Sequence, residues 1–295
     1  MPSCTSVGQE AVRARTRSWP TLVQDGLLFV WHDPEHNPPP PEVVIPRIEG
    51  ADSDEWTEWV WRSLVVDSNC REIVDNVVDM AHFFYVHFSF PTYFKNVMEG
   101  HVASQYQSGS AREDVRPAAA AGEPYMTGND STASYYGPSF MIDELRYHYS
   151  DGTTVDNVLI NCHYPITPDR FVLQYGILVK KSAHLPADAA SRMAEVSAEH
   201  IGRGFEQDVA IWQNKTRIDN PLLCEEDGPV YQLRRWYEQF YVDVAEVTAE
   251  MTNRFEFELD TSRPVEAWKQ EVAARMAARA VERGRPGPAA GPGAG

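Results

Sequence analysis

The 295-residue sequence is poor in cysteine, and none of its cysteines stands in a metal-ligand pattern. The four residues, Cys4, Cys70, Cys162 and Cys224, are widely scattered, and no C-x-x-C, C-x-H or C-x-x-H occurs. This spacing excludes a zinc ribbon, a ferredoxin cluster or a Rieske cluster built from this chain alone. Because no disulfide framework is suggested, a reduced, cytoplasmic protein is expected.

Positive charge and long apolar runs are also scarce. The chain has 26 Lys and Arg against 43 Asp and Glu, a net charge of −17. Nucleic acids and anionic membranes bind clustered basic residues, so neither is expected as a partner. No signal peptide opens the sequence, and no apolar run reaches the roughly 18 residues of a membrane span. Phosphate-binding, dinucleotide-binding, serine-hydrolase and zincin motifs are missing too.

The chain divides into three parts by composition. Pro38 to Pro41 form a stiff proline run, typical of an extended linker, so a boundary is expected near residue 42. The preceding 1–41 are too short for a domain and resemble a last strand with its linker. Residues 42–283 hold the periodic elements of one domain, and 284–295 form a Gly- and Pro-rich tail expected to be disordered.

Hydrophobic periodicity predicts an α+β fold in which an antiparallel sheet wraps a long helix. A helix is expected over about 69–84, with Ser68 as its N-cap, and a long helix over about 187–215. Further helices are predicted at 230–241 and 263–283. Strands are predicted at 26–31, 55–66, 99–107, 131–137, 154–164 and 170–180.

Two histidines five residues apart, His82 and His87, follow Asp79 in an aromatic-rich segment. Two imidazoles with one distant carboxylate and open positions make a non-haem Fe(II) oxygenase site. On a regular helix the two rings would point about 140° apart. They converge on one metal only if the helix ends or distorts between them, which Pro91 favours. The alternative is two core histidines bonded to backbone carbonyls.

The long helix offers the carboxylate. Ile201, Phe205, Asp208 and Trp212 recur at spacings of four, three and four, which places an acid within an apolar helix face. Such a carboxylate requires a cation, and an iron held by two neutral imidazoles supplies one. The alternatives are an ion pair with Arg203 or Arg217, or a position at a wet edge.

The segment from Asn69 to His87 resembles the iron-binding segment of Rieske non-haem iron oxygenases, and within them the 3-ketosteroid 9α-hydroxylases. The similarity covers roughly residues 15–270 and includes 90–97, 136–139, 159–165 and 222–243. It implies that His82, His87 and Asp208 bind iron. It also implies that Asp79 acts in catalysis by bridging toward the cluster histidine of a neighbouring subunit in a homotrimer.

The same resemblance implies a substrate pocket and a reaction. Asp143 falls where the usual pattern has an asparagine. The implied reaction is 9α-hydroxylation of a 3-ketosteroid in steroid or cholesterol degradation, using O₂ and mononuclear Fe(II), with Gln105 or Asn161 donating a hydrogen bond to a ketone. The residues implied to contact substrate are Val77, Gln105, Tyr135, Met141, Asn161, Phe205 and Trp212.

In such oxygenases an NADH-dependent ferredoxin reductase supplies electrons through a 2Fe–2S Rieske cluster. The ligands of that cluster are absent from this chain. The resemblance therefore implies an isolated catalytic domain, a truncated gene product or a misassigned start, which binds iron and steroid without turnover. Two alternatives are a non-catalytic steroid- or lipid-binding module, and a truncated, inactive oxygenase for another apolar substrate.

Overall fold

The computed structural model describes residues 18–115, 123–182, 187–224 and 226–284. The chain forms two compact units that divide between Asp52 and Ser53. This division lies ten residues beyond the boundary expected from the proline run. The tail expected to be disordered lies outside the described residues except for Gly284. The assignment of residues 1–41 as a domain remnant stays a prediction.

The first unit contains a β-hairpin of β1 (Thr21–Gln24) and β2 (Leu27–Val30). Its two-residue turn, Asp25-Gly26, has positive φ at both positions, as a type I′ hairpin turn requires. The Asp25 carboxylate accepts the Ile48 N–H at 2.9 Å and pairs with Arg47 at 3.2 Å. The strand predicted at 26–31 is therefore the second arm of a hairpin.

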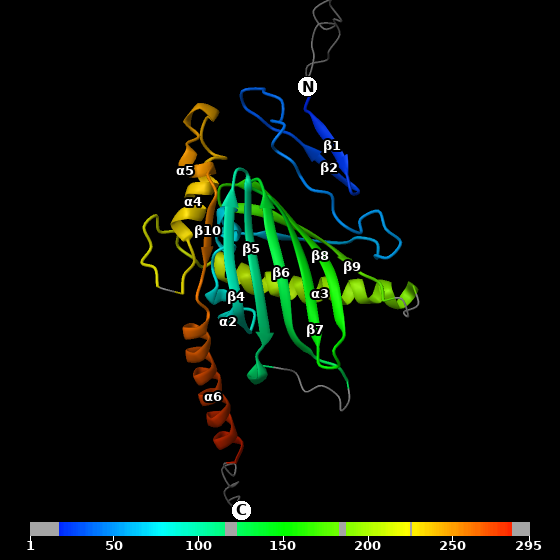
Figure 1. Cartoon of the computed structure of the whole chain (residues 1–295), viewed down its shortest axis with the longest axis vertical. Coiled ribbons are helices and arrows are strands. Elements are labelled where there is room, and N and C mark those ends of the chain that lie inside the picture. Colours follow the sequence, from blue (N-terminus) through cyan, green and yellow to red (C-terminus); the bar gives the residue numbers. More distant parts are fainter. Residues whose placement is uncertain (1–17, 116–122, 183–186, 225, 285–295) are drawn as a thin grey trace, which may run out of the picture. The chain divides into compact units, whose positions relative to one another are not determined.

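In the described part of the second unit, eight strands form one antiparallel sheet in the order β10-β4-β5-β6-β7-β8-β9-β3 (Figure 1). The sequence prediction missed β4, β7 and β10. The bounds are β3 Val60–Val66, β4 Ser89–Glu99, β5 Val102–Ala111, β6 Met126–Tyr136, β7 Phe140–Tyr149, β8 Thr154–Thr167, β9 Arg170–Val179 and β10 Phe255–Glu258.

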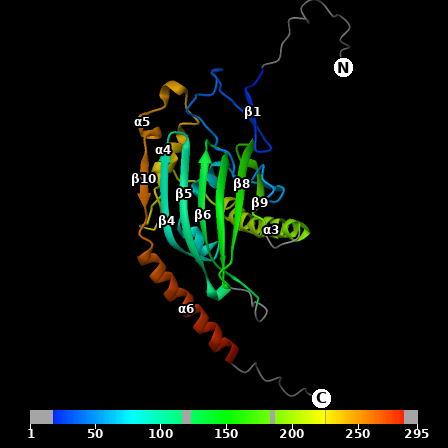
Figure 2. The same ribbon diagram turned by 45° about the vertical axis from the view of Figure 1, so that its right-hand side comes forward.

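The long helix α3 (Ala187–Trp212) crosses one face of this sheet and packs against β9 and β3 (Figures 1 and 2). Ala190, Ala194 and Ala198 recur every four residues on its buried side, which permits close packing. The other helical elements are α1 Arg71–Asp75, α2 Ala81–Tyr85, α4 Val230–Glu238, α5 Ala249–Thr252, α6 Ser262–Gly284, and the 3₁₀ turns η2 Glu113–Val115 and η3 Val244–Glu246.

The single helix expected over 69–84 is wrong, because α1 and α2 are separated by non-helical residues. The carbonyl groups of Asn76 and Val77 accept hydrogen bonds from the side chain of Gln105 on the sheet. Ser68 is not an N-cap either, since its hydroxyl donates to the Trp212 carbonyl at 2.9 Å. Tertiary hydrogen bonds thus override helix propensity here.

The antiparallel sheet gripping a long helix confirms the predicted α+β class. Among the residues described, no helix combines the length and apolar character needed to cross a membrane.

Candidate metal centre

The structure brings together the three residues predicted to bind a metal. His82 lies on α2, His87 lies just beyond its end, and Asp208 lies on α3. Their ligand atoms all lie within 4.8 Å of one another. Nε2 of His87 is 3.3 Å from Oδ1 of Asp208, and the two imidazole rings are 5.1 Å apart at 79°. These donors can therefore face one ion.

The two histidines converge because α2 ends after little more than one turn. The His82 carbonyl accepts hydrogen bonds from both Val86 N–H, at 2.7 Å, and His87 N–H, at 3.2 Å. The second bond spans five residues, so it widens the turn and carries His87 back toward the side of His82. The expected end of the helix is confirmed. Pro91 is not its cause, because it lies beside an irregularity within β4.

A buried guanidinium holds this turn. Arg112 donates to the Phe84 carbonyl at 2.6 Å and lies 4.3 Å above the Phe84 ring. Two further hydrogen bonds, of 3.0 and 2.8 Å, join it to the Asp114 carboxylate. Its backbone N–H donates to the carbonyl of Phe88, whose φ of 56° is unusual for a large side chain. The sequence analysis did not identify Arg112, because this arginine is not part of a recognisable sequence motif.

The His87 ring packs over Gly204 of α3. A Cβ at Gly204 would lie 3.8 Å from Cε1 of His87, so the ring packs over this helix position. A Cβ at Gly202 would lie 2.5 Å from the Tyr175 hydroxyl. Glycine within a helix costs roughly 1 kcal/mol relative to alanine. Two glycines within two turns of Asp208 were the available sequence signal for this close approach, and it was missed.

The second nitrogen of His82 is already engaged. Nδ1 contacts the backbone carbonyl of Asp79, which favours the tautomer with Nε2 free for a metal. The Asp79 carboxylate, 44% exposed, accepts the backbone N–H of His82 at 3.1 Å and lies 4.0 Å from Nδ1. Hence the backbone carbonyl, rather than the carboxylate, orients the ring. Burial lowers the pKa of His82, favouring the neutral, metal-binding form.

The arginine alternatives for Asp208 are wrong. Arg217 pairs instead with Glu72, at 3.5 Å, and with Asp75, at 3.7 Å. Within the described ranges, no ion pair joins Arg203 to Asp208, and the side chain beside the Asp208 carboxylate is the His87 imidazole. Two imidazoles and one carboxylate therefore form a donor set of the kind that binds non-haem Fe(II).

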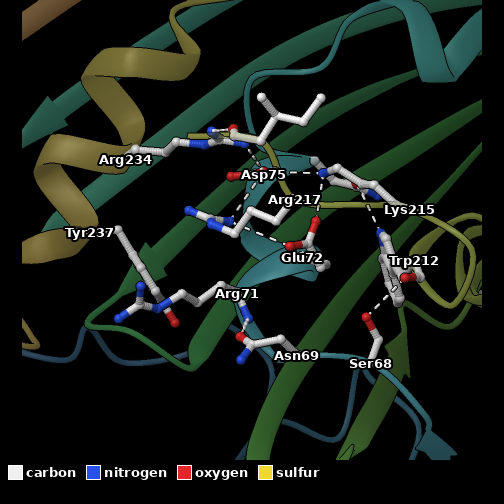
Figure 3. A network of polar contacts seen from close by, with 12 residues as sticks. Ser68, Asn69, Arg71, Glu72, Asp75, Trp212, Lys215, Arg217, Arg234 and Tyr237 are labelled. Atoms are coloured by element: carbon white, nitrogen blue, oxygen red, sulfur yellow. Dashed lines mark hydrogen bonds and ion pairs between the residues drawn. The ribbon is translucent and has the colours of Figure 1, made fainter. Parts of the chain in front are cut away.

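A buried network of charges fixes α1 relative to the chain that follows α3 (Figure 3). Lys215 lies 2.7 Å from the Glu72 carboxylate and 3.1 Å from that of Asp75. Arg234 of α4 also pairs with Asp75, at 3.0 Å. Such pairs are costly to break singly because the remaining charge would stay buried. The network therefore holds α1, α4 and the end of α3 together.

A cavity of about 120 Å³ opens beside the candidate ligands His82 and Asp208. All seven residues predicted to contact substrate line it, namely Val77, Gln105, Tyr135, Met141, Asn161, Phe205 and Trp212. Sequence reasoning did not assign its other lining residues, Ile73, Asn76, Phe83, Ala133, Asp143 and Leu159. Ala133, Asp143 and Leu159 each lie two positions from a predicted pocket residue on β6, β7 and β8 respectively. Side chains two positions apart on a strand share a face, so this alternation was the signal that could have found them.

The polar groups of the cavity differ in availability. The Gln105 side-chain nitrogen donates to the carbonyls of Asn76, at 3.1 Å, and Val77, at 2.8 Å. It therefore has no N–H left for a ketone, contrary to the expectation. Asn161 is buried, and its Oδ1 has no hydrogen-bond partner among the described residues. Of the two amides, Asn161 is the one with a free side-chain atom, an oxygen that can accept a hydrogen bond from a ligand but cannot donate one to a ketone.

Two buried titratable groups belong to the same region. Oδ1 of Asp143 accepts a hydrogen bond from the Ser131 hydroxyl at 2.7 Å, and burial raises the pKa of Asp143 to about 7. His163 packs between the rings of Tyr135 and Phe171. Burial lowers its pKa to about 4, so this histidine is neutral near pH 7. His163 packs in the core rather than joining the metal group.

Comparison with known proteins gives consistent matches. A family model described as the 3-ketosteroid 9α-hydroxylase C-terminal domain matches residues 30–241. A 3-ketosteroid-9-alpha-monooxygenase oxygenase component from Rhodococcus rhodochrous is 67% identical over 268 residues, covering 91% of this chain and 68% of the relative. The corresponding component from Mycobacterium tuberculosis is 56% identical over 270 residues, covering 91% of this chain and 69% of that relative. The chain spans about two thirds of their length.

A solved structure shares the fold. The match to dicamba monooxygenase bound to 3,6-dichlorosalicylic acid covers 76% of this chain and 70% of the monooxygenase chain, with a TM-score of 0.55 and 16% sequence identity. This likeness confirms the predicted fold, in which an antiparallel sheet wraps a long helix.

Enlarging Gly204 tests the packing of His87 on α3. Gly204→Ala should retain metal affinity, because the added methyl meets His87 at an ordinary contact distance. Gly204→Val should weaken Fe(II) or Co(II) binding about 10- to 100-fold by displacing the ring, as loss of a supporting contact commonly does. Metal titration measures both, and equal affinities for the two variants would contradict this placement.

The raised pKa of Asp143 predicts a pH-dependent stability. Between about pH 4 and 7 the folded state binds more protons at this group than the unfolded state does, so ionisation destabilises the fold as pH rises. Between pH 5 and pH 8 the free energy of unfolding of the natural protein should fall by on the order of 2 kcal/mol relative to that of Asp143→Asn. Urea unfolding at the two pH values measures this fall. Asp151→Asn, at an exposed turn, is the control and should show little change. If the free energies of unfolding of the natural protein and Asp143→Asn differed by the same amount at every pH, burial of the acid would be contradicted.

Proposed function

The chain belongs to the family of 3-ketosteroid 9α-hydroxylase oxygenase components, and on that premise we propose that it binds one Fe(II) and hydroxylates a 3-ketosteroid at the 9α position. The observation that carries this proposal is the meeting of His82, His87 and Asp208 beside a cavity lined by the residues expected to contact substrate.

The donor set suits the proposed metal. His82 and His87 would each supply an imidazole nitrogen and Asp208 a carboxylate oxygen, which leaves positions open for other ligands. Iron held there supplies the site at which O₂ is activated. The Asp79 carbonyl keeps the His82 ring oriented, and Arg112 keeps the turn that precedes His87 closed. These contacts preorganise the three donors.

The cavity walls would position and shield an apolar substrate. Met141, Phe205 and Trp212 offer hydrophobic surface, while Oδ1 of Asn161 can accept a hydrogen bond. The cavity of about 120 Å³ is smaller than the roughly 300–1,000 Å³ of typical ligand sites. Binding of a four-ring substrate therefore requires side chains to move, and the flexible Met141 is suited to do so. Closure around the substrate would then exclude water from the reacting carbon.

The proposed reaction needs electrons, and these 295 residues contain no ligand motif for a Rieske cluster that would deliver them. The sequence has no C-x-H or C-x-x-H, so its cysteines do not fit a Rieske 2Fe–2S cluster. We propose an NADH-dependent ferredoxin reductase as the ultimate donor, in the cytoplasm, within steroid degradation. The exposed carboxylate of Asp79, beside His82, is the group we propose to face a cluster-bearing neighbour in a homotrimer.

Replacing each proposed ligand tests the metal site. His82→Ala and Asp208→Ala should each lose stoichiometric iron, with affinity reduced at least about 100-fold, because two donors hold the ion poorly. Metal analysis after dialysis measures the loss. His148→Ala, which removes an exposed histidine paired with Asp130, is the matched control and should retain one iron per chain. Full iron in either ligand variant would overturn the assignment.

Turnover tests the electron supply. Loaded with Fe(II), this chain should bind a 3-ketosteroid but yield no hydroxylated product with NADH and a reductase, because its sequence contains no cluster ligands. Addition of a cluster-bearing oxygenase subunit of the same family should be required for product. Product analysis by mass spectrometry decides the question, and sustained turnover by the isolated chain would refute this requirement.

A further inference from the structure

Asp143 is a cavity acid that the proposed iron chemistry does not use. It lies in the middle of β7, two residues from Met141 and on the same face of the sheet, so both side chains line the cavity. The other acid of the lining, Asp208, belongs to the metal group. One oxygen of Asp143 accepts the Ser131 hydroxyl at 2.7 Å. Within the described chain its second oxygen has no hydrogen-bond partner.

Among the residues that the structure describes, no Lys or Arg lines the cavity beside Asp143. Ser131 faces it from β6, and Leu159 is its register partner on β8. On β7 itself, Tyr147 is near enough to be affected by its charge, and Glu144 opposes its ionisation. The other polar or titratable side chains that line the cavity are Asn76, His82, Gln105, Tyr135, Asn161 and Asp208.

This environment favours the neutral carboxylic acid. Desolvation, reinforced by Glu144, raises the pKa of Asp143 to about 7 against the single lowering contact from Ser131. Because the Ser131 hydroxyl donates to Oδ1, the acid proton belongs on Oδ2, the oxygen without a partner. A buried carboxylic acid held neutral in an apolar site is an effective hydrogen-bond donor to a ketone oxygen.

We propose that Asp143 selects substrates by donating its carboxylic O–H to a ketone oxygen of the bound polycycle. This inference rests on the proposed function, and it adds the group that recognises the ketone. A ketone only accepts hydrogen bonds, so the protonated acid binds it and the carboxylate repels it. A hydroxyl at the same position can donate as well as accept, so it binds either form. Asp143 thus makes the preference between ketone and alcohol depend on pH.

Binding of a matched pair of ligands tests the proposal. A 3-ketosteroid and the corresponding 3-hydroxysteroid are titrated into the full chain at pH 6 and pH 8.5, with quenching of tryptophan fluorescence as the signal, since Trp212 lines the cavity. The Kd of the ketone should rise about 30-fold between the two values, tenfold for each pH unit above 7. The Kd of the alcohol should change less than about 3-fold.

Two variants separate donation from packing. Asp143→Asn keeps the shape and an N–H donor at every pH, so ketone binding should become independent of pH and stay near the value of the natural protein at pH 6. Asp143→Leu removes the donor and should weaken ketone binding about 10-fold at pH 6. Difference infrared spectra of the natural protein and the Asn variant should show a protonated carboxyl at pH 6 that disappears by pH 8.5.

The possible outcomes are distinct. Tight ketone binding that does not vary with pH in the natural protein overturns the role of Asp143 while leaving the steroid assignment intact. Failure of both ligands to bind any form overturns the proposed substrate class and this inference together. Loss of pH dependence in Asp143→Asn, with the carboxyl signal removed, supports the assignment.

Discussion

The two hydrogen bonds accepted by the His82 carbonyl are the constraint on which the metal centre depends. They close α2 and bring His87 back beside His82, whereas a continued regular helix would direct the two rings about 140° apart. Arg112 stabilises this turn through the Phe84 carbonyl and the Phe84 ring. Its ion pair with Asp114 neutralises its charge in a buried site, so the segment that follows β5 controls the spacing of two histidines some thirty residues earlier in the chain.

A second set of contacts brings the carboxylate to the histidines. Trp212 donates through its indole N–H to the Asn76 side chain at 3.2 Å, and its carbonyl accepts from Ser68. Together with the ion pairs of Lys215 to Glu72 and Asp75, these bonds fasten the end of α3 to the segment that leads into α2. Asp208, one turn before Trp212, is therefore positioned by packing and hydrogen bonds formed within the protein chain.

Periodicity in the sequence predicted the gross fold and much of the site, for physical reasons that also explain the failures. The four-three-four spacing around Asp208 identified the helix face because α3 is long and regular. The split between α1 and α2 was not predicted, because the side chain of Gln105, some thirty residues away, bonds the intervening carbonyls. Arg112 and Gly204 act through contacts distant in sequence, so no local pattern marks them. The resemblance to a known family supplied the substrate-pocket residues that spacing alone did not.

The site thus combines a rigid donor set with a small, adaptable cavity whose polar groups have separate tasks. His82, His87 and Asp208 face one point, while Asn161 and Asp143 remain available to a ligand. The most direct measurement is anomalous diffraction at the iron edge from crystals of the protein loaded with Fe(II). A single iron peak within about 2.3 Å of a nitrogen of each histidine and of an Asp208 oxygen is the predicted result. A peak that lacks any one of these three ligands, or iron bound at another place, would contradict it.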